Sequence, residues 1–346
     1  MSENNNKWEM RWNPFLSEWV IIASQTSGRP WSGHVLKNQD EILSEFDEGC
    51  YLCPGVKRAS GVTNPVYDKT FVFDNDFASF APHAPDVFRD DDFFKAIPAK
   101  GECRVVCFSP KHNVVLAQMT KEDIKVVVET WKNEFLELSQ KEYIKNILIF
   151  ENKGKVIGVS NPHPHGQIYA TGFIPRTILQ EVFAGAKYFK DKQECLFCNY
   201  LKSELTEKSR IVIENDSFVL FVPYFARYSY ETQLIPKRHF HVITEMTEKE
   251  TVDFADILRK TLCRYDNLFG MIMPNIMMMH NAPVDGEDYS SFYHFHMEFY
   301  PPLRSPDKLK YLAGFESGGG NIINPTDPDF AAEELRKVSD IHFRNL

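Results

Sequence analysis

An internal repeat is the feature of this sequence that most constrains its fold. Each half carries, in the same order, a C-x-x-C pair, a histidine that follows Pro and Lys, an amphipathic helical stretch, an H-x-H strand and an aromatic–proline segment. An internal repeat of this kind indicates the overall architecture of a chain more directly than a single motif does. The sequence therefore predicts an α+β chain of two tandem modules, residues 1–176 and 177–346, each an antiparallel sheet with a helix packed on one face.

The pattern of apolar residues supplies the elements of these modules. Helical spacing over 121–138 places Ile124, Trp131 and Phe135 on one side, and 247–268 is the matching helix of the second half. The remaining helices are expected over 177–190 and 329–340. The expected strands are 70–73, 103–108, 146–150, 210–214, 217–222, 271–280 and 292–300.

The composition of the chain indicates which binding partners and which cellular compartment to expect. Lys and Arg number 39 against 48 Asp and Glu, a formal net charge of −9, whereas proteins that bind a nucleic acid backbone are more often basic. No stretch approaches the roughly 20 apolar residues of a membrane span, and the N-terminus lacks the apolar core of a signal peptide. We therefore expect no nucleic acid partner, no membrane association and a cytoplasmic location, where paired cysteines are more often metal ligands than disulfides.

The two C-x-x-C pairs predict two metal sites. Zinc takes four sulfur and nitrogen ligands in a tetrahedron, and a site filled entirely by protein ligands is structural. The candidate ligands are Cys50, Cys53, His112 and His163 in the first half, and Cys195, Cys198, His239 and His294 in the second. The alternative for each cysteine is a buried apolar thiol, which is the favoured interpretation for Cys103, Cys107 and Cys263.

The run His-Pro-His-Gly-Gln at 163–167 is the strongest candidate for catalysis. His163, His165 and Gln167 alternate along a strand and so point the same way, and Gly166 admits a ligand close to the backbone. With His163 on zinc, a neutral His165 is free to attack phosphorus, and Gln167 can donate a hydrogen bond to the oxygen that gains charge. The alternative is that both histidines are metal ligands or packed core residues.

These motifs resemble the galactose-1-phosphate uridylyltransferase family of the histidine-triad superfamily. The resemblance is carried by residues 150–154 and 158–167, and the H-P-H-G-Q run within the latter is highly specific. It extends through 29–31, 75–77, 264–269 and 338–343, and so covers nearly the whole chain. The resemblance implies that the two tandem modules are histidine-triad-like.

The resemblance also implies an activity, the exchange of a uridylyl group between UDP-glucose and galactose 1-phosphate in galactose metabolism. His165 would attack the α-phosphorus and carry the uridylyl group, while Gln167 stabilises the phosphoryl oxygens and Ser160 lies near the reacting group. The positions that match the family's substrate contacts are Asn75, Asp76 and Phe77 for uridine and ribose, Asn152, Gly158 and Ser160 for the phosphates, and Lys310, Phe315 and Glu316 for the sugar phosphate. Arg29 matches a phosphate-binding arginine supplied across the subunit interface, so a homodimer is implied.

The sequence departs from the family pattern in three places. A second basic residue expected just before Arg29 is absent, and Thr26 and Gly28 stand there. Family members carry a second metal, often described as iron, whose ligands match Glu181, His280 and His296, with Glu298 at the fourth position. The second C-x-x-C resembles instead a zinc site of the ADP-glucose phosphorylase branch, so zinc there is favoured and iron is the alternative. The segment 318–320 is Gly-Gly-Gly, either a phosphate cradle or a flexible turn.

Two rival functions stay open at this point. The second C-x-x-C and the glycine segment suit a nucleotidyltransferase of another specificity, such as a phosphorylase acting on ADP-glucose or a dinucleoside polyphosphate. A non-catalytic, zinc-stabilised nucleotide-binding module is the other rival. The intact first motif disfavours that module, because a nucleophile with its oxyanion donor rarely assembles without use.

Overall fold

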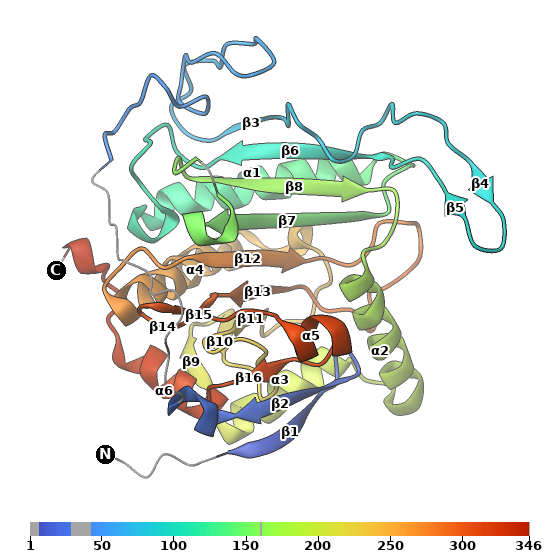
Figure 1. Ribbon diagram of the computed structural model, residues 1–346, viewed down its shortest axis with the longest axis vertical. Helices are drawn as coiled ribbons and strands as arrows, with labels where there is room; N and C mark the ends of the chain where they lie inside the picture. The colour runs from blue at the N-terminus through green and yellow to red at the C-terminus, as the bar shows by residue number, and fades with distance from the viewer. Residues whose placement is uncertain (1–6, 29–42, 160, 346) are drawn as a thin grey trace.

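A single antiparallel sheet of nine strands forms the centre of the protein (Figure 1). The computed structural model describes residues 7–28, 43–159 and 161–345. In spatial order the strands are β3 (Phe71–Asp74), β6 (Gly101–Cys107), β8 (His165–Thr171), β7 (Asn146–Lys153), β12 (Asn275–His280), β13 (His296–Tyr300), β11 (Thr232–Pro236), β10 (Phe218–Phe221) and β9 (Ile211–Glu214). The predicted α+β class is confirmed.

Strands β7 and β12 join the two halves of the chain. Their pairing runs from Asn275 opposite Lys153 to Met279 opposite Ile149. Each strand precedes the H-x-H strand of its own half, so the two occupy equivalent places in the repeat. The sequence predicts a sheet for each module. The structure adds that these sheets pair edge to edge, which leaves neither of the two joining edges exposed.

Two long helices cover one face of this sheet, behind it in Figure 1. Both α1 (Lys121–Ser139) and α4 (Glu248–Phe269) begin after a threonine, Thr120 or Thr247, whose side chain accepts a backbone hydrogen bond from the first turn. The helices pack against each other, and Trp131 lies in a core cluster that draws residues from both halves. The predicted helices at 121–138 and 247–268 are confirmed, whereas the domain boundary at residue 176 stays a prediction.

The smaller elements surround the central sheet. Strand β2 (Glu18–Ala23) pairs antiparallel with β1 (Trp8–Asn13) and parallel with β16 (Ile323–Asn324). The remaining elements are β4 (Arg89–Asp90), β5 (Lys95–Ala96), β14 (Leu303–Ser305), β15 (Lys308–Leu309), α2 (Arg176–Lys192), α3 (Leu196–Glu207), α5 (Gly314–Gly319) and α6 (Pro328–Lys337). Of the helices in the described ranges, none combines the length and apolar character needed to cross a bilayer.

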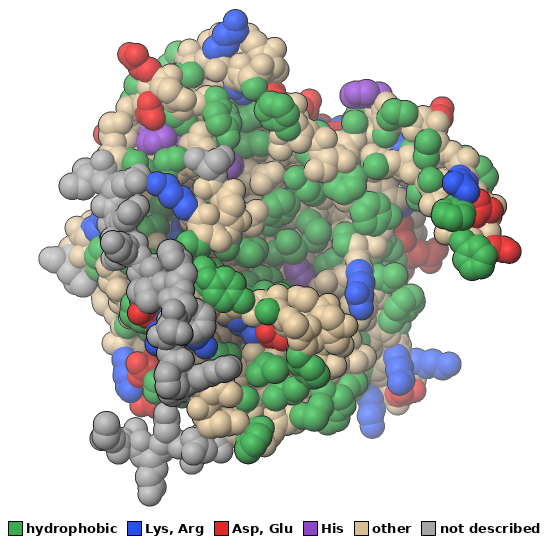
Figure 2. Space-filling model, in the orientation of Figure 1, with side chains coloured by type: hydrophobic (Ala, Val, Ile, Leu, Met, Phe, Trp, Pro, Cys, Tyr) green, Lys and Arg blue, Asp and Glu red, His purple; other side chains and the backbone are tan. Residues whose placement is uncertain are grey.

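Among the described residues, no long helix crosses the centre of the opposite face of the sheet (Figure 1). Figure 2 shows this face hollowed in its middle, with hydrophobic side chains around the hollow. The strand registers place the alternating residues of β8, β7, β12 and β13 in rows across it, one of which runs Gln167, Phe150, Met278, Glu298. The predicted catalytic strand and the second-half histidines therefore share one face of one sheet.

Candidate active site and metal centres

His165 stands at the start of β8 with one ring nitrogen held and the other free of the metal clusters. Its Nδ1 lies 2.7 Å from the carbonyl oxygen of His163. A carbonyl can only accept, so Nδ1 carries the proton and Nε2 keeps its lone pair. Burial lowers the pKa of His165, against the hydrogen bond to His163, which raises it. The ring is therefore a neutral imidazole at neutral pH, the form that a nucleophile needs.

Gly166 lets β8 pack closely against its neighbours. The sequence suggests instead that this glycine lets a ligand approach the backbone. A Cβ on this residue would lie 2.7 Å from Cζ of Phe108 and 2.8 Å from the carbonyl oxygen of Phe150. Both contacts are closer than real side chains tolerate. A residue without a side chain is what lets β8 lie against Phe108 and keep His165 and Gln167 in register.

Gln167 is oriented by a neighbour from the end of β3. The Nδ2 group of Asn75 donates to Oε1 of Gln167 at 3.5 Å, and Oδ1 of Asn75 accepts from the Phe77 amide at 2.9 Å. With its oxygen held by Asn75, Gln167 presents its amide NH₂ as a donor. The predicted oxyanion role needs this orientation.

A cavity of about 430 Å³ opens beside these groups, within the size range of small-molecule sites. Its lining includes His165 and Gln167 together with the predicted substrate contacts Asn75, Asp76, Phe77, Asn152 and Gly158. The sequence interpretation missed the other half of the lining, which is Tyr51, Leu52, Ala59, Phe73, Val105, Val159 and Asn161. Phe73 could have been found, since it alternates with Asn75 along the same extended segment.

The predicted sugar-phosphate contacts lie elsewhere. Lys310, Phe315 and Glu316 are not part of this cavity's lining. The Nζ of Lys310 donates to Oε1 of Glu316 and to the carbonyl oxygen of Ile323, each at 2.6 Å. Gly318 and Gly319 belong to the short helix α5, and the Gly320 amide bonds back to Glu316. The predicted residues Arg29 and Ser160 fall outside the described residues.

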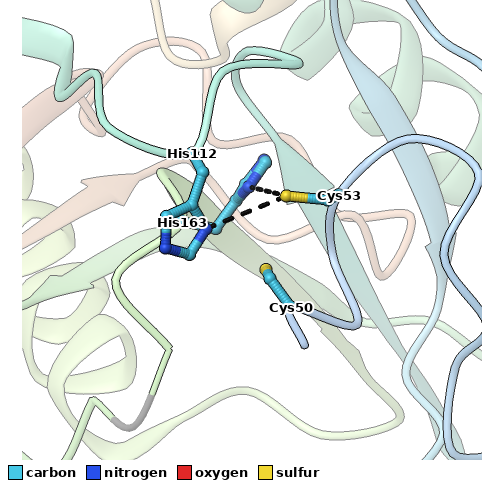
Figure 3. A group of neighbouring side chains, drawn as sticks. All are labelled: Cys50, Cys53, His112 and His163. Carbon is cyan, nitrogen blue, oxygen red and sulfur yellow. Dashed lines mark hydrogen bonds between the residues drawn. The ribbon is translucent and has the colours of Figure 1, made fainter. Parts of the chain in front are cut away.

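Among the described residues, three groups of four side chains have the spacing of a metal site, and their ligand atoms lie within 4.8 Å of one another. The first group is Cys50, Cys53, His112 and His163 (Figure 3), all buried. The Sγ of Cys53 lies 3.9 Å from Nδ1 of His112 and 3.6 Å from Nδ1 of His163. Nε2 of His163 donates to the Ser109 carbonyl oxygen at 2.9 Å, which leaves Nδ1 as the ligand atom. Burial raises the pKa of Cys53 to about 11, so a cation is what would hold this thiol as a thiolate.

The second group repeats this geometry in the second half of the chain. The Sγ of Cys198 lies 3.2 Å from Nδ1 of His239 and 3.4 Å from Nδ1 of His294. Nε2 of His239 donates to the Ser290 carbonyl oxygen at 2.8 Å. Cys195, the residue before α3, completes the set. The donor set of two sulfurs and two nitrogens is one that zinc fits.

The third group is Glu181, His280, His296 and Glu298, all buried. Nδ1 of His280 lies 2.8 Å from Oε1 of Glu181, while Nε2 of His296 lies 3.6 Å from Glu181 and 3.8 Å from Glu298. That Nε2 is buried and has no hydrogen-bond partner among the described residues. An imidazole nitrogen enclosed between two carboxylates suits a divalent metal ion. The second and third groups share no residue, so the sites that the sequence poses as alternatives are separate.

Solved structures with this fold define the class of the protein. The chain superposes on a uridylyltransferase structure with a TM-score of 0.77 and 29% sequence identity, over 95% of this chain and 97% of the other. An ADP-glucose phosphorylase from Arabidopsis thaliana, 23% identical, shares the fold with a TM-score of 0.78 over 96% and 100% of the two chains. With the sequence relatives below, this makes the protein an enzyme of the nucleotidyltransferase class.

The chain belongs to the galactose-1-phosphate uridyl transferase family. The N-terminal domain profile of that family matches residues 1–175, and the C-terminal domain profile matches 181–346. The galactose-1-phosphate uridylyltransferases of Haemophilus influenzae and Schizosaccharomyces pombe are each 39% identical to this chain. These alignments cover 96% and 97% of this chain, and 95% and 96% of the relatives. The resemblance noted from the motifs is confirmed.

Proposed function

We propose that this enzyme transfers a uridylyl group from UDP-glucose to galactose 1-phosphate through a covalent intermediate on His165. The observation that carries the proposal is the hydrogen bond from His165 Nδ1 to the His163 carbonyl oxygen, in a residue that lines a cavity of nucleotide size. The names of the sequence relatives support the substrates. The proposal accounts for a neutral imidazole beside an oriented amide donor.

The proposed reaction has two displacements at the same phosphorus. In the first, the lone pair of His165 Nε2 forms a P–N bond with the α-phosphorus of UDP-glucose, and the P–O bond to glucose 1-phosphate breaks. Glucose 1-phosphate leaves with the electron pair. In the second, a phosphate oxygen of galactose 1-phosphate attacks, the P–N bond breaks, and UDP-galactose leaves with a neutral imidazole restored. Gln167 donates to the phosphoryl oxygens in both steps.

The substrate contacts follow from the lining of the cavity. We assign Asn75, Asp76 and Phe77 to uridine and ribose, and Asn152 and Gly158, with Ser160, to the phosphates. None of the predicted sugar-phosphate contacts Lys310, Phe315 and Glu316 belongs to this lining. We propose that a homodimer supplies them, with Lys310, Phe315, Glu316 and Arg29 of one copy reaching the cavity of the other. The exposed ring of Phe315, 56% accessible in one chain, supports a role at an interface.

We propose zinc at both Cys₂His₂ groups. At the first, zinc would fix His163, whose carbonyl oxygen orients His165, so the metal is structural and only indirectly serves the reaction. For the third group, Glu181, His280, His296 and Glu298, the nitrogen and carboxylate donors suit zinc or iron. The seven free cysteines support a reducing location, the cytoplasm.

The decisive experiment asks whether the protein keeps the uridylyl group. Purified enzyme is mixed with UDP-glucose labelled in the uridine, without acceptor, and the denatured protein is counted. We expect about one label per chain, lost on addition of galactose 1-phosphate, and no label in a His165→Gly variant. An unlabelled wild-type protein that also fails to exchange the sugars would refute the proposal. Rates with ADP-glucose and phosphate, measured beside these, test the rival specificity.

A further inference from the structure

We propose that Arg58 is a positioning residue for the nucleotide, holding Asp76 and Phe73 in the wall of the cavity. Both of these residues line the cavity, whereas Arg58 does not. The inference rests on the proposed function, because it assigns the wall formed by Phe73, Asn75, Asp76 and Phe77 to the uridine. No step of the reaction described above uses Arg58.

Arg58 and the backbone of its loop each bind one carboxylate oxygen of Asp76. Nη1 of Arg58 donates to Oδ1 at 3.2 Å, and the backbone amide of Ser60 donates to Oδ2 at 3.2 Å. The Arg58 and Asp76 side chains are 10% and 13% exposed, so solvent screens the pair little. Each oxygen keeps a further acceptor site that a ribose hydroxyl or a base N–H can use.

The same guanidinium also holds the aromatic part of the wall. Its Cζ lies 4.1 Å from the ring centroid of Phe73, a cation–π distance. Phe71, two residues earlier on the same face of β3, stacks on Phe73 with the ring centroids 5.4 Å apart. One side chain therefore fixes a flat apolar surface and a hydrogen-bond acceptor next to it, the two elements that a nucleoside needs from a binding wall.

Backbone hydrogen bonds close the loop that carries Arg58. The Arg58 amide donates to the Val62 carbonyl oxygen at 2.8 Å, and the Gly61 amide donates to the Arg58 carbonyl oxygen at 3.0 Å. Gly61 has φ 88°, a backbone conformation that favours glycine. The loop continues from the first C-x-x-C, where the Asn64 side chain donates to the Cys53 carbonyl oxygen at 3.0 Å. Arg58 thus connects the loop that follows the first C-x-x-C to the nucleotide wall.

The alternative is that Arg58 only stabilises the fold. A buried ion pair is weak evidence for stability, because desolvation of the two charges offsets their attraction. The Nε of Arg58 is buried without a hydrogen-bond partner among the described residues, which further weakens a purely stabilising role. A positioning role predicts an effect on nucleotide affinity that a structural role does not.

The test measures kinetics and nucleotide binding in Arg58→Met and Arg58→Lys. We expect KM for UDP-glucose and Kd for UDP to rise about tenfold in Arg58→Met, the effect of losing one charge-assisted hydrogen bond. We expect kcat and the zinc content to stay near wild type, whereas the thermal midpoint should fall, because Arg58→Met leaves the Asp76 carboxylate without its charged partner. Lysine keeps the charge without the planar fork, so Arg58→Lys should recover part of the affinity. In an Asp76→Asn background, Arg58→Met should add less than about threefold.

The chain offers a matched control. Arg89 also pairs with an aspartate, Asp91 at 2.8 Å, and lies over a phenylalanine, Phe94 at 4.4 Å, but on a hairpin outside the cavity. Arg89→Met should leave KM and Kd unchanged. Wild-type KM and Kd in Arg58→Met, or an effect that is fully additive with Asp76→Asn, would overturn the inference. UDP calorimetry needs no turnover, so a wild type that binds UDP but exchanges no sugars would sink the proposed function alone.

Discussion

The two halves of the chain place an imidazole by the same backbone device. Nδ1 of His165 donates to the His163 carbonyl oxygen at 2.7 Å, and Nδ1 of His296 donates to the His294 carbonyl oxygen at 2.9 Å. In each half the preceding histidine belongs to a Cys₂His₂ group. The repeat therefore places an imidazole, with its Nδ1 held by the backbone, at two equivalent points of one sheet.

The two halves differ in the groups that surround the Nε2 atom of this histidine. Beside His165 the space is a cavity, whereas His296 is fully buried. Helix α2 brings Glu181 to within 3.6 Å of its Nε2, and Phe197 of α3 lies 4.8 Å from the ring. The comparison teaches that the repeat positions the imidazole, while helices α2 and α3 of the second half make that position part of a closed, acidic group.

The two halves also differ at the residue two positions after each of these histidines, Gln167 after His165 and Glu298 after His296. Gln167 presents a neutral amide that suits an anionic phosphate, whereas Glu298 presents a carboxylate that would repel one. Glu298 is instead held by Nε2 of Gln233 at 2.7 Å and Nη2 of Arg227 at 3.4 Å. Although burial opposes ionisation, His280 and His296 hold the pKa of Glu181 well below its usual range. The donors of one half therefore suit an anion, whereas the side chains of the other half could hold a cation.

The largest expected effect comes from removing each imidazole in turn. His165→Ala should lower sugar exchange by about 10⁴-fold or more, because the nucleophile is lost. His296→Ala should keep the chemistry and lose metal from the third group. Exchange rates and metal content of the two variants check this. A His296→Ala variant that retains its metal content, or a His165→Ala variant that still exchanges, would break the comparison.

The next effect comes from making the first half resemble the second. Gln167→Glu should slow transfer about 10²–10³-fold, since the donor is lost and a negative charge faces the phosphate. Gln167 is only half-buried, so the thermal midpoint should hardly change. Single-turnover rates with UDP-glucose measure the loss, and Glu298→Gln is the matched variant, expected to transfer at close to the wild-type rate. Equal losses in both would contradict the assignment.

Short motifs carry the sequence predictions for the first-half site. The two Cys₂His₂ groups, the His165 strand and helices α1 and α4 follow from spacing and periodicity, whereas the third ligand group is expected only from the family resemblance. The edge pairing of β7 with β12 does not, because an apolar strand pattern does not name its partner. Helix α3 was missed although Phe197 and Leu201 lie one turn apart, since a short apolar run fits several elements. The apolar cavity wall was missed because Leu52, Ala59 and Val105 look like ordinary core residues.

Metal removal separates the two Cys₂His₂ groups. Cys50→Ser and Cys195→Ser should each lose one zinc per chain and lower the free energy of unfolding by about 3 kcal/mol or more, because bound zinc contributes to folding. Cys50→Ser should affect stability more than the chemical step. Cys195→Ser should leave KM for UDP-glucose unchanged, since its group lies in the other half. Elemental analysis, thermal unfolding and steady-state kinetics check these outcomes, and unchanged zinc and stability in either variant would refute its metal assignment.

The smallest effect, and the finest contrast between the halves, is in their response to pH. Burial lowers the pKa of His165 below the ordinary histidine value of 6.5. In the second half, Glu181 and Glu298 outweigh burial and raise the pKa of His280. Attack needs the unprotonated ring, so kcat/KM for UDP-glucose should stay level as the pH falls through 6.5 and decline only below it. An acid limb centred at or above 6.5 would mean that the ring of His165 is not desolvated in the free enzyme, and that the open and closed halves differ less than their geometry indicates.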